Sequence, residues 1–122
     1  MSYVMKFEPN LPEYCNVYDR MFCHTLIQEL LDGGYSVTVN DGEDDCIIRS
    51  RDFAKILEAM SQSGEDGIIP IDSSGESVGW FHLIYDNGSE GDPLICMSDM
   101  TANSICKDIY YTVTRILEEQ EL

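Results

Sequence analysis

The spacing of apolar residues switches repeatedly along this chain between the period of an α-helix and the period of a β-strand. Apolar side chains recur every four residues from Tyr18 to Leu30, which places them on one face of a helix. Asn10 or Asn16 could cap this helix, and Gly33-Gly34 supplies the left-handed position at its end. The segment therefore predicts a first helix that is followed directly by a turn.

The next segments predict a hairpin and a second helix. Tyr35–Asn40 alternates apolar and polar residues, Asp41-Gly42 marks a tight turn, and Cys46–Arg49 follows, which indicates a hairpin with one buried face. Ser50 can cap a second helix, whose apolar residues start at Phe53 and follow at i+3, i+4 and i+7.

Three further strands are expected in the second half of the chain. Gly67–Ile71 follows a polar link at 61–66 and contains Pro70, which favours a sheet edge because proline lacks the N–H of a ladder hydrogen bond. Val78–Tyr85 is apolar at both parities, which is typical of a central strand covered on both faces. Leu94–Met97 is the last of these strands.

A last helix should follow, capped by Asp99 or Thr101. Its apolar side would comprise Ile105, Ile109, Val113 and Ile116. The predicted order α-β-β-α-β-β-β-α, with strands joined by tight turns, indicates an α+β fold with three helices and a largely antiparallel sheet of about five strands. We expect a single domain over residues 1–122, because two separate cores in 122 residues would each be too small to be stable.

The charge balance is strongly acidic, with 7 Lys plus Arg against 23 Asp plus Glu and a formal net charge of -16. Between Ile56 and Cys106 there is no Lys or Arg. Direct binding to nucleic acid or to an anionic membrane is therefore disfavoured. The charge serves either solubility alone or a surface that meets a basic partner.

The cysteines and the N-terminus indicate a reduced, cytoplasmic protein. The five cysteines contain no C-x-x-C pair, and Cys46, Cys96 and Cys106 sit inside apolar runs, so we expect reduced thiols in the core. No leader peptide is recognisable, and no apolar stretch approaches the ~18 residues of a membrane span. We expect neither export nor membrane insertion.

Sequence motifs of catalytic, cofactor and metal sites are missing from the chain. The phosphate loop, the dinucleotide fingerprint, the H-E-x-x-H zinc helix and the G-x-S-x-G elbow do not occur. His24 and His82 are the only histidines, and the acids around Asp41-Gly42 lack the spacing of a calcium loop. We therefore expect no enzyme, no cofactor and no metal. Trp80 and Phe81 are expected in the core, and one of Tyr110 and Tyr111 on the surface.

Clusters of acidic residues in predicted loops are the candidate partner-binding site. They are Asp41, Glu43, Asp44, Asp45, Glu65, Asp66, Glu90 and Asp92. A compact chain of this length is about 35 Å across, and duplex DNA of that length carries about twenty charges at one per ~1.7 Å. Sixteen net charges approach that number. Mimicry of nucleic acid is thus feasible if the carboxylates share one face.

Three stretches of the chain carry a resemblance: Val37–Glu43, Arg49-Ser50 and Val78–Gly88. In these stretches the chain resembles small acidic proteins carried by phages and plasmids, over about two-thirds of its length. Those proteins have no assigned activity, so the resemblance implies no site residue. It implies a context, because small accessory proteins of mobile elements often inhibit host defence or host nucleic-acid enzymes.

The sequence therefore predicts a non-enzymatic acidic binding protein of phage or mobile-element type. Its expected partner is a basic nucleic-acid-binding host defence protein, such as a restriction or CRISPR component, which it would inhibit as a DNA mimic. One alternative is an immunity protein that neutralises a basic toxin nuclease. Another is a small enzyme with a site built from scattered acids and His82. A sheet edge or an exposed Tyr110 face would suit a homodimer under any of these hypotheses.

Overall fold

The fold was obtained as a computed structural model, which describes residues 17–41, 43–60, 65–84, 94–100 and 103–120. Within these residues there are three helices and five strands. In chain order they are α1 (Val17–Asp32), β1 (Ser36–Asn40), β2 (Asp45–Ser50), α2 (Phe53–Ala59), β3 (Glu65–Ile71), β4 (Gly79–Ile84), β5 (Leu94–Asp99) and α3 (Ile105–Gln120). The predicted α+β class and element order are confirmed.

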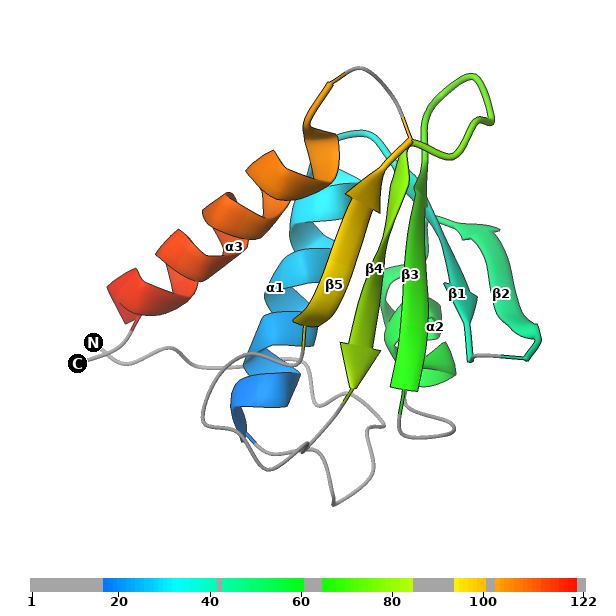
Figure 1. The fold of residues 1–122 in the computed structure, drawn as a ribbon. Helices are drawn as coiled ribbons and strands as arrows, with labels where there is room; N and C mark the ends of the chain where they lie inside the picture. The colour runs from blue at the N-terminus through cyan, green and yellow to red at the C-terminus, as the bar shows by residue number, and fades with distance from the viewer. Residues whose placement is uncertain (1–16, 42, 61–64, 85–93, 101–102, 121–122) are drawn as a thin grey trace.

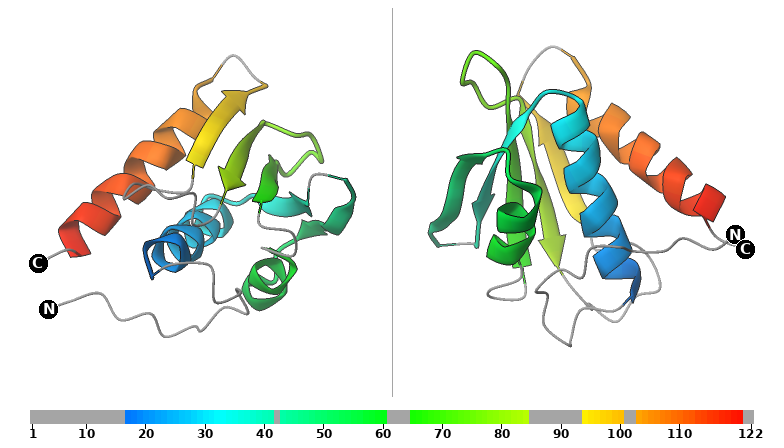
Figure 2. Two further views of the ribbon diagram at one scale, coloured as in Figure 1. Left: turned by 60° about the horizontal axis from the view of Figure 1, so that its bottom comes forward. Right: turned by 180° about the vertical axis from the view of Figure 1, so that it is seen from behind.

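The five described strands form one antiparallel sheet with the order β2-β1-β3-β4-β5. The helices pack on one face of this sheet, with α1 and α2 directly over the strands and α3 beside β5 (Figures 1 and 2). We call the other face, which is turned to the viewer in Figure 1, the open face. No helix among the described residues is both long and apolar enough to cross a bilayer.

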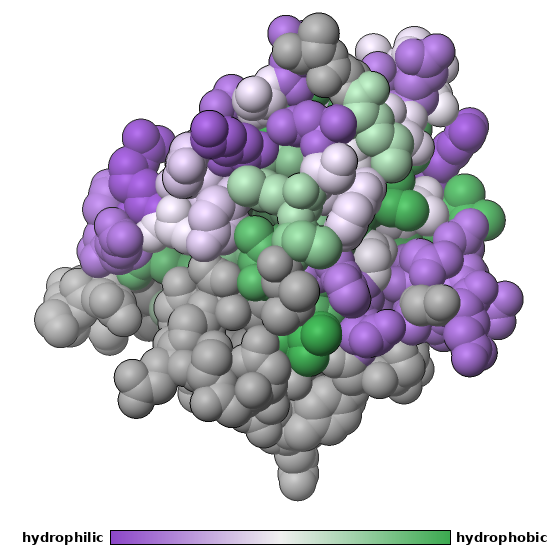
Figure 3. Space-filling model, in the orientation of Figure 1, coloured by the Kyte–Doolittle hydropathy of each residue, from purple (hydrophilic) through white to green (hydrophobic). Residues whose placement is uncertain are grey.

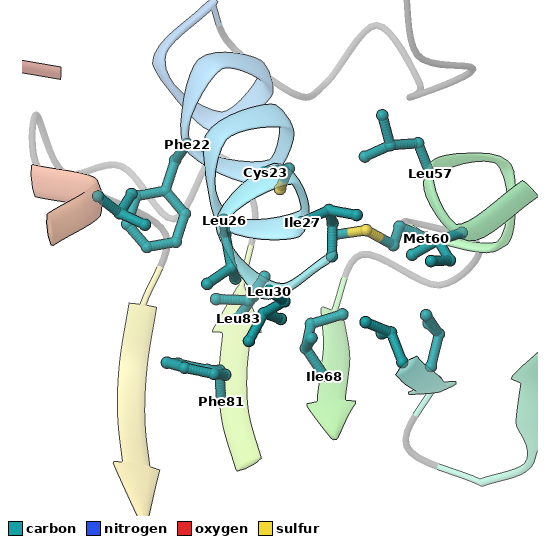
Figure 4. Packing of buried hydrophobic residues seen from close by; sticks show 14 of the residues in the cluster. Phe22, Cys23, Leu26, Ile27, Leu30, Leu57, Met60, Ile68, Phe81 and Leu83 are labelled. Atoms are coloured by element: carbon teal, nitrogen blue, oxygen red, sulfur yellow. The ribbon is translucent and has the colours of Figure 1, made fainter. Parts of the chain in front are cut away.

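The core lies between α1 and the middle strands, where side chains from both layers interdigitate (Figure 4). Its fully buried members include Phe22 and Leu26 from α1, Ile68 from β3, and Phe81 and Leu83 from β4. These side chains follow the two predicted periods, four in the helix and two in the strands. Burial of each such side chain stabilises the fold by about 1.5–3 kcal/mol.

The C-terminus of α1 ends as the glycines predict and is also held by a residue from another element. Gly34 has a φ of 91°, and the N–H of Tyr35 donates to the carbonyl of Leu30, as in a Schellman motif. The guanidinium of Arg51 donates to the carbonyls of Tyr35 (2.6 Å) and Leu31 (3.1 Å). The two residues predicted as N-caps of this helix lie outside the described residues.

The cap of α2 differs from the prediction. Asp52, not Ser50, is the N-cap, because its carboxylate accepts the N–H of Lys55 at 3.1 Å. The hydroxyl of Ser50 instead accepts the N–H of Asp52. The predicted apolar stripe of this helix is present, with Ile56, Leu57 and the adjoining Met60 buried.

The position predicted for the strand that contains Pro70 was wrong. This strand, β3, begins at Glu65 and is the central strand, paired with both β1 and β4. The continuous register with β4 ends at Ile68, and beyond it the carbonyl of Pro70 accepts the N–H of Val78. Pro70 therefore lies beyond the continuous pairing of β3 with β4, and on that side of the strand its missing N–H costs little.

The described helices cover β4 on one face only, whereas the sequence indicated cover on both faces over at least part of this strand. Phe81 and Leu83 point into the core, whereas Trp80, His82 and Ile84 are half-buried on the open face. Trp80 is therefore not a core residue, and only Phe81 fulfils the expectation for this pair. The sequence did not reveal that one face is less buried, because this strand carries apolar side chains on both faces and therefore shows no alternation of apolar and polar residues.

The edge strands β2 and β5 are more exposed than the sequence predicted. β2 is an edge strand with most side chains exposed, and Ile47 alone is half-buried against the core. Cys23 and Cys106 are buried, as expected of core thiols, whereas Cys46 and Cys96 are exposed, so that expectation was wrong for these two. Cys15 lies outside the described residues. Both thiols point away from the core despite their apolar neighbours in sequence, because Cys96 pairs with His82 of the open face and Cys46 alternates with the inward-facing Ile47.

The start of α3 packs tightly on β4. Asp99 lies six residues before the first helical residue, Ile105, so it is not the N-cap in sequence, but its carboxylate accepts the N–H of Cys106 at 2.6 Å; the other predicted cap, Thr101, lies outside the described residues. The Cys106 side chain lies against Gly79. Burial raises the pKa of this thiol to about 12, so it remains protonated. The buried stripe of α3 runs through Cys106, Val113 and Leu117, and Tyr111 is 57 % exposed, as expected for one of the two tyrosines.

Replacement of Gly79 by alanine should destabilise the fold. A methyl group at this position would lie 2.5 Å from the carbonyl oxygen of Ser98 and would collide with the sulfur of Cys106. We expect Gly79→Ala to lower the free energy of unfolding by about 1–3 kcal/mol, measured by urea denaturation. Gly67→Ala is the control, because among the described residues its methyl would meet only atoms of Asn40, at 3.8 Å. Equal destabilisation by both substitutions would contradict this account.

Candidate partner-binding site

The topology brings several acidic segments to one end of the sheet. The strand pairing places Asn40 opposite both Asp45 and Gly67, and Glu65 opposite Ile84. The β1–β2 turn, the start of β3 and the end of β4 therefore lie together, at the lower end of the strands in Figure 1. We call the acids of this region the acidic end. They are Asp41, Glu43, Asp44, Asp45 and Glu65.

Asp41 builds the turn that presents its neighbours. One oxygen of its carboxylate accepts the N–H groups of Glu43 (2.9 Å) and Asp44 (2.8 Å), and its own N–H donates to the carbonyl of Asp44. These hydrogen bonds, chiefly that from Asp44, lower the pKa of Asp41 below its ordinary value. Glu43, Asp44 and Asp45 are exposed. The negative charge of the turn is thus fixed in place by its backbone.

Glu65 extends the acidic end onto the open face. Its carboxylate lies 3.9 Å from Nε2 of His82, its diagonal neighbour on β4, and both side chains are partly exposed. Along the next row of the sheet, the amide of Asn40 donates to the carboxylate of Asp45 at 2.9 Å. The open face beside Trp80 was missed as a functional surface at the sequence level. The sequence offered one indication of this surface. Trp80 and His82 alternate with Phe81 and Leu83, so in a strand they must point to the opposite face.

Asp66 does not belong to the contact surface that was predicted. It points toward the helices from β3 and is only 1 % exposed, so its carboxylate cannot meet a partner on the surface. The prediction failed because Asp66 was placed in a loop, whereas the strand already includes it. The predicted contact residues Glu90 and Asp92 lie outside the described residues.

Positive charge among the described strands lies at the far end of β2. Arg49 and Arg51 face a shallow hollow of about 500 Å³ that also contains Asp72. Figure 3 shows hydrophilic side chains gathered around the β1–β2 turn, with apolar and weakly polar ones over the middle strands. The strand residues at the acidic end include no Lys or Arg. The arginines of this region therefore lie away from the acidic end, in the company of Asp72.

Features of a catalytic or metal site are sparse in the part of the chain that the structure describes. No group of three His, Cys, Asp or Glu side chains there could hold a metal ion. A shallow hollow of about 370 Å³ lies between the end of α1 and the start of α3, lined partly by Glu29, Asp32 and Asp108. The ring of His24 packs edge-on against Phe53 at 4.9 Å, and burial lowers its pKa. Packing accounts for His24.

Comparison with protein-family models, with curated proteins and with solved structures gave no match. The interpretation of the acidic end therefore rests on its geometry and charge. The resemblance to phage and plasmid proteins stays a prediction.

The acidic turn should depend on the ionised form of Asp41. A carboxyl whose pKa is lowered by folding stabilises the folded state above its unfolded pKa, near 3.8, and loses this contribution as the pH falls through its folded pKa. We expect Asp41→Ala to destabilise the protein fully at about pH 6 and progressively less below about pH 4. Urea denaturation across this range measures the effect.

Asp44→Ala is the matched control, because it removes one carboxylate from the same turn but leaves the hydrogen bonds to Asp41. Its effect should not follow the same pH profile. A pH-independent loss of stability in Asp41→Ala, or the same profile in both variants, would show that the carboxylate of Asp41 does not organise the turn.

Proposed function

We propose that this protein is a non-enzymatic binding protein whose acidic end docks onto a basic surface of a nucleic-acid-binding protein and blocks it. The observation that carries the proposal is the gathering of acids from the β1–β2 turn and from the start of β3 at one end of the sheet, where the described turn and strand residues include no Lys or Arg. Charge of one sign on a compact surface attracts a surface of the opposite sign and accelerates association.

The rigidity of the turn supports the proposal. Exposed carboxylates on a fixed backbone lose less entropy on binding than those on a flexible tail, so more of their attraction appears as affinity. Asp41 supplies this rigidity through its hydrogen bonds to Glu43 and Asp44. The acids that contact a partner would then be Glu43, Asp44, Asp45 and Glu65.

Inhibition follows from competition for the same cationic groups. A protein that binds DNA or RNA presents Lys and Arg to phosphates, and a carboxylate can accept hydrogen bonds from the same guanidinium and ammonium groups. A partner occupied by the acidic end could therefore not bind nucleic acid at that site. The resemblance to small accessory proteins of mobile elements, which is a prediction from the sequence, adds the class of target. A restriction or CRISPR component is the class of partner that fits both this resemblance and this chemistry.

The proposal predicts binding that depends steeply on salt and on the β1–β2 turn. Immobilised protein should retain basic nucleic-acid-binding proteins from a bacterial lysate at low salt and release them at high salt. For a purified partner, we expect the association rate to fall about tenfold to a thousandfold as ionic strength rises. Nuclease or DNA-binding assays should show that the added protein inhibits the partner.

A pair of triple variants separates local from overall charge. Glu43→Gln, Asp44→Asn and Asp45→Asn neutralise the turn, whereas a control with Glu76→Gln, Glu118→Gln and Glu119→Gln removes the same charge elsewhere. The control residues are exposed, and α3 ends far from the turn (Figure 1). Only the turn variant should lose binding and inhibition. An affinity that does not change with salt concentration, or an equal loss of binding in both variants, would contradict the proposal.

A further inference from the structure

The open face of the middle strands carries an aromatic and polar surface that the fold itself does not require. Trp80 and His82 project from β4 on this side, with ring centroids 6.4 Å apart, and both are half-buried. Ile69 of β3 lies on the same face and is also half-buried. The described helices all pack on the opposite face (Figure 2). The open face is therefore an amphipathic surface without a packing role in the core.

Gly67 leaves the backbone bare in the middle of this surface. It lies in one row of the sheet between Asn40 and His82. Among the described residues, a methyl group on Gly67 would meet only Asn40, at ordinary contact distance, so the described part of the chain leaves room above this position. A side chain from outside can approach the backbone here and reach the rings of β4.

Carboxylates border this position on two sides. Asp45 is held by Asn40 at one end of the row, and Glu65 lies beside His82 at the other. His82 faces Gly67 directly, whereas Trp80 lies two residues away on β4, so a cationic segment that follows this face would meet negative charge first and an aromatic ring next to it. Arginine has the chemistry for both, because its planar guanidinium stacks on aromatic rings and donates paired hydrogen bonds to carboxylates. The ammonium of lysine offers a point charge only.

We propose that the open face over β3 and β4 takes an arginine-bearing segment of the partner protein, with one guanidinium against Trp80 and a second cationic side chain near Glu65, which pairs with Ile84 further along β4. The inference rests on the proposed function and extends it, because it names arginine as the partner group. The charge complementarity comes from the acidic end, which adjoins this face (Figure 3). The acidic end attracts the segment, and Trp80 discriminates arginine from lysine.

Two peptides of equal charge test the proposal, nona-arginine and nona-lysine. Trp80 is the only tryptophan of the chain, so its fluorescence reports on the open face alone. We expect nona-arginine to change the emission of Trp80 and to protect it from acrylamide quenching. Calorimetry should give about three- to tenfold tighter binding for nona-arginine than for nona-lysine, the range that a cation–aromatic contact can supply.

Trp80→Ala should abolish this preference for arginine, whereas Tyr111→Ala, which removes an exposed aromatic ring from α3, should keep it. Because the fluorescence experiment uses the unaltered protein, it decides the question even if Trp80→Ala unfolds. Equal binding of both peptides without a change at Trp80 would overturn the inference and leave the proposed function standing. Failure of both peptides to bind at low salt would overturn both proposals.

Discussion

The packing of α1 against the middle strands is the contact on which the rest of the structure depends. Leu26 and Leu30 of α1 lie close to Leu83 of β4, all of them fully buried, and Phe22 lies on the side of α3, with its ring next to that of Tyr110 (Figure 4). Such burial contributes about 1.5–3 kcal/mol for each side chain, whereas an exposed pair such as His82 and Glu65 contributes about 0–1 kcal/mol. The one-sided core therefore holds the fold and leaves the open face and the strand ends available for other roles.

The antiparallel topology determines where the charge is placed. Because β1, β3 and β4 run in alternating directions, the β1–β2 turn and the start of β3 meet at the same end of the sheet. Acids that are distant in sequence are thereby brought together, and the arginines Arg49 and Arg51 lie at the other end of β2. Arg51 is used to hold the end of α1, so part of the small positive charge serves the fold. Among the described residues, the acids of the β1–β2 turn are thus separated from these two arginines by the length of β2.

The sequence predicted the fold class and the element order because local periodicity determines both. It did not predict which strand is central, because pairing partners are set by tertiary packing. Pro70 suggested an edge strand, but it lies where the continuous pairing of β3 with β4 has ended and is tolerated there. For the candidate site, the acids of the β1–β2 turn could be predicted from the composition of the turn. The burial of Asp66 could not be predicted, because a charged residue next to a polar segment is expected in a loop and not among the inward-facing residues of a strand. The role of Trp80 depends on which face the helices cover, which no local pattern encodes.

The central claim is that cationic partners dock at the acidic end and the adjoining open face. Amide NMR spectra of the labelled protein, recorded during titration with an arginine-rich peptide at low salt, test it most directly. The account predicts that shift changes cluster in the β1–β2 turn, at the start of β3 and along β4 from Trp80 to Ile84. Changes spread evenly over the surface, or concentrated in the hollow between α1 and α3, would contradict it.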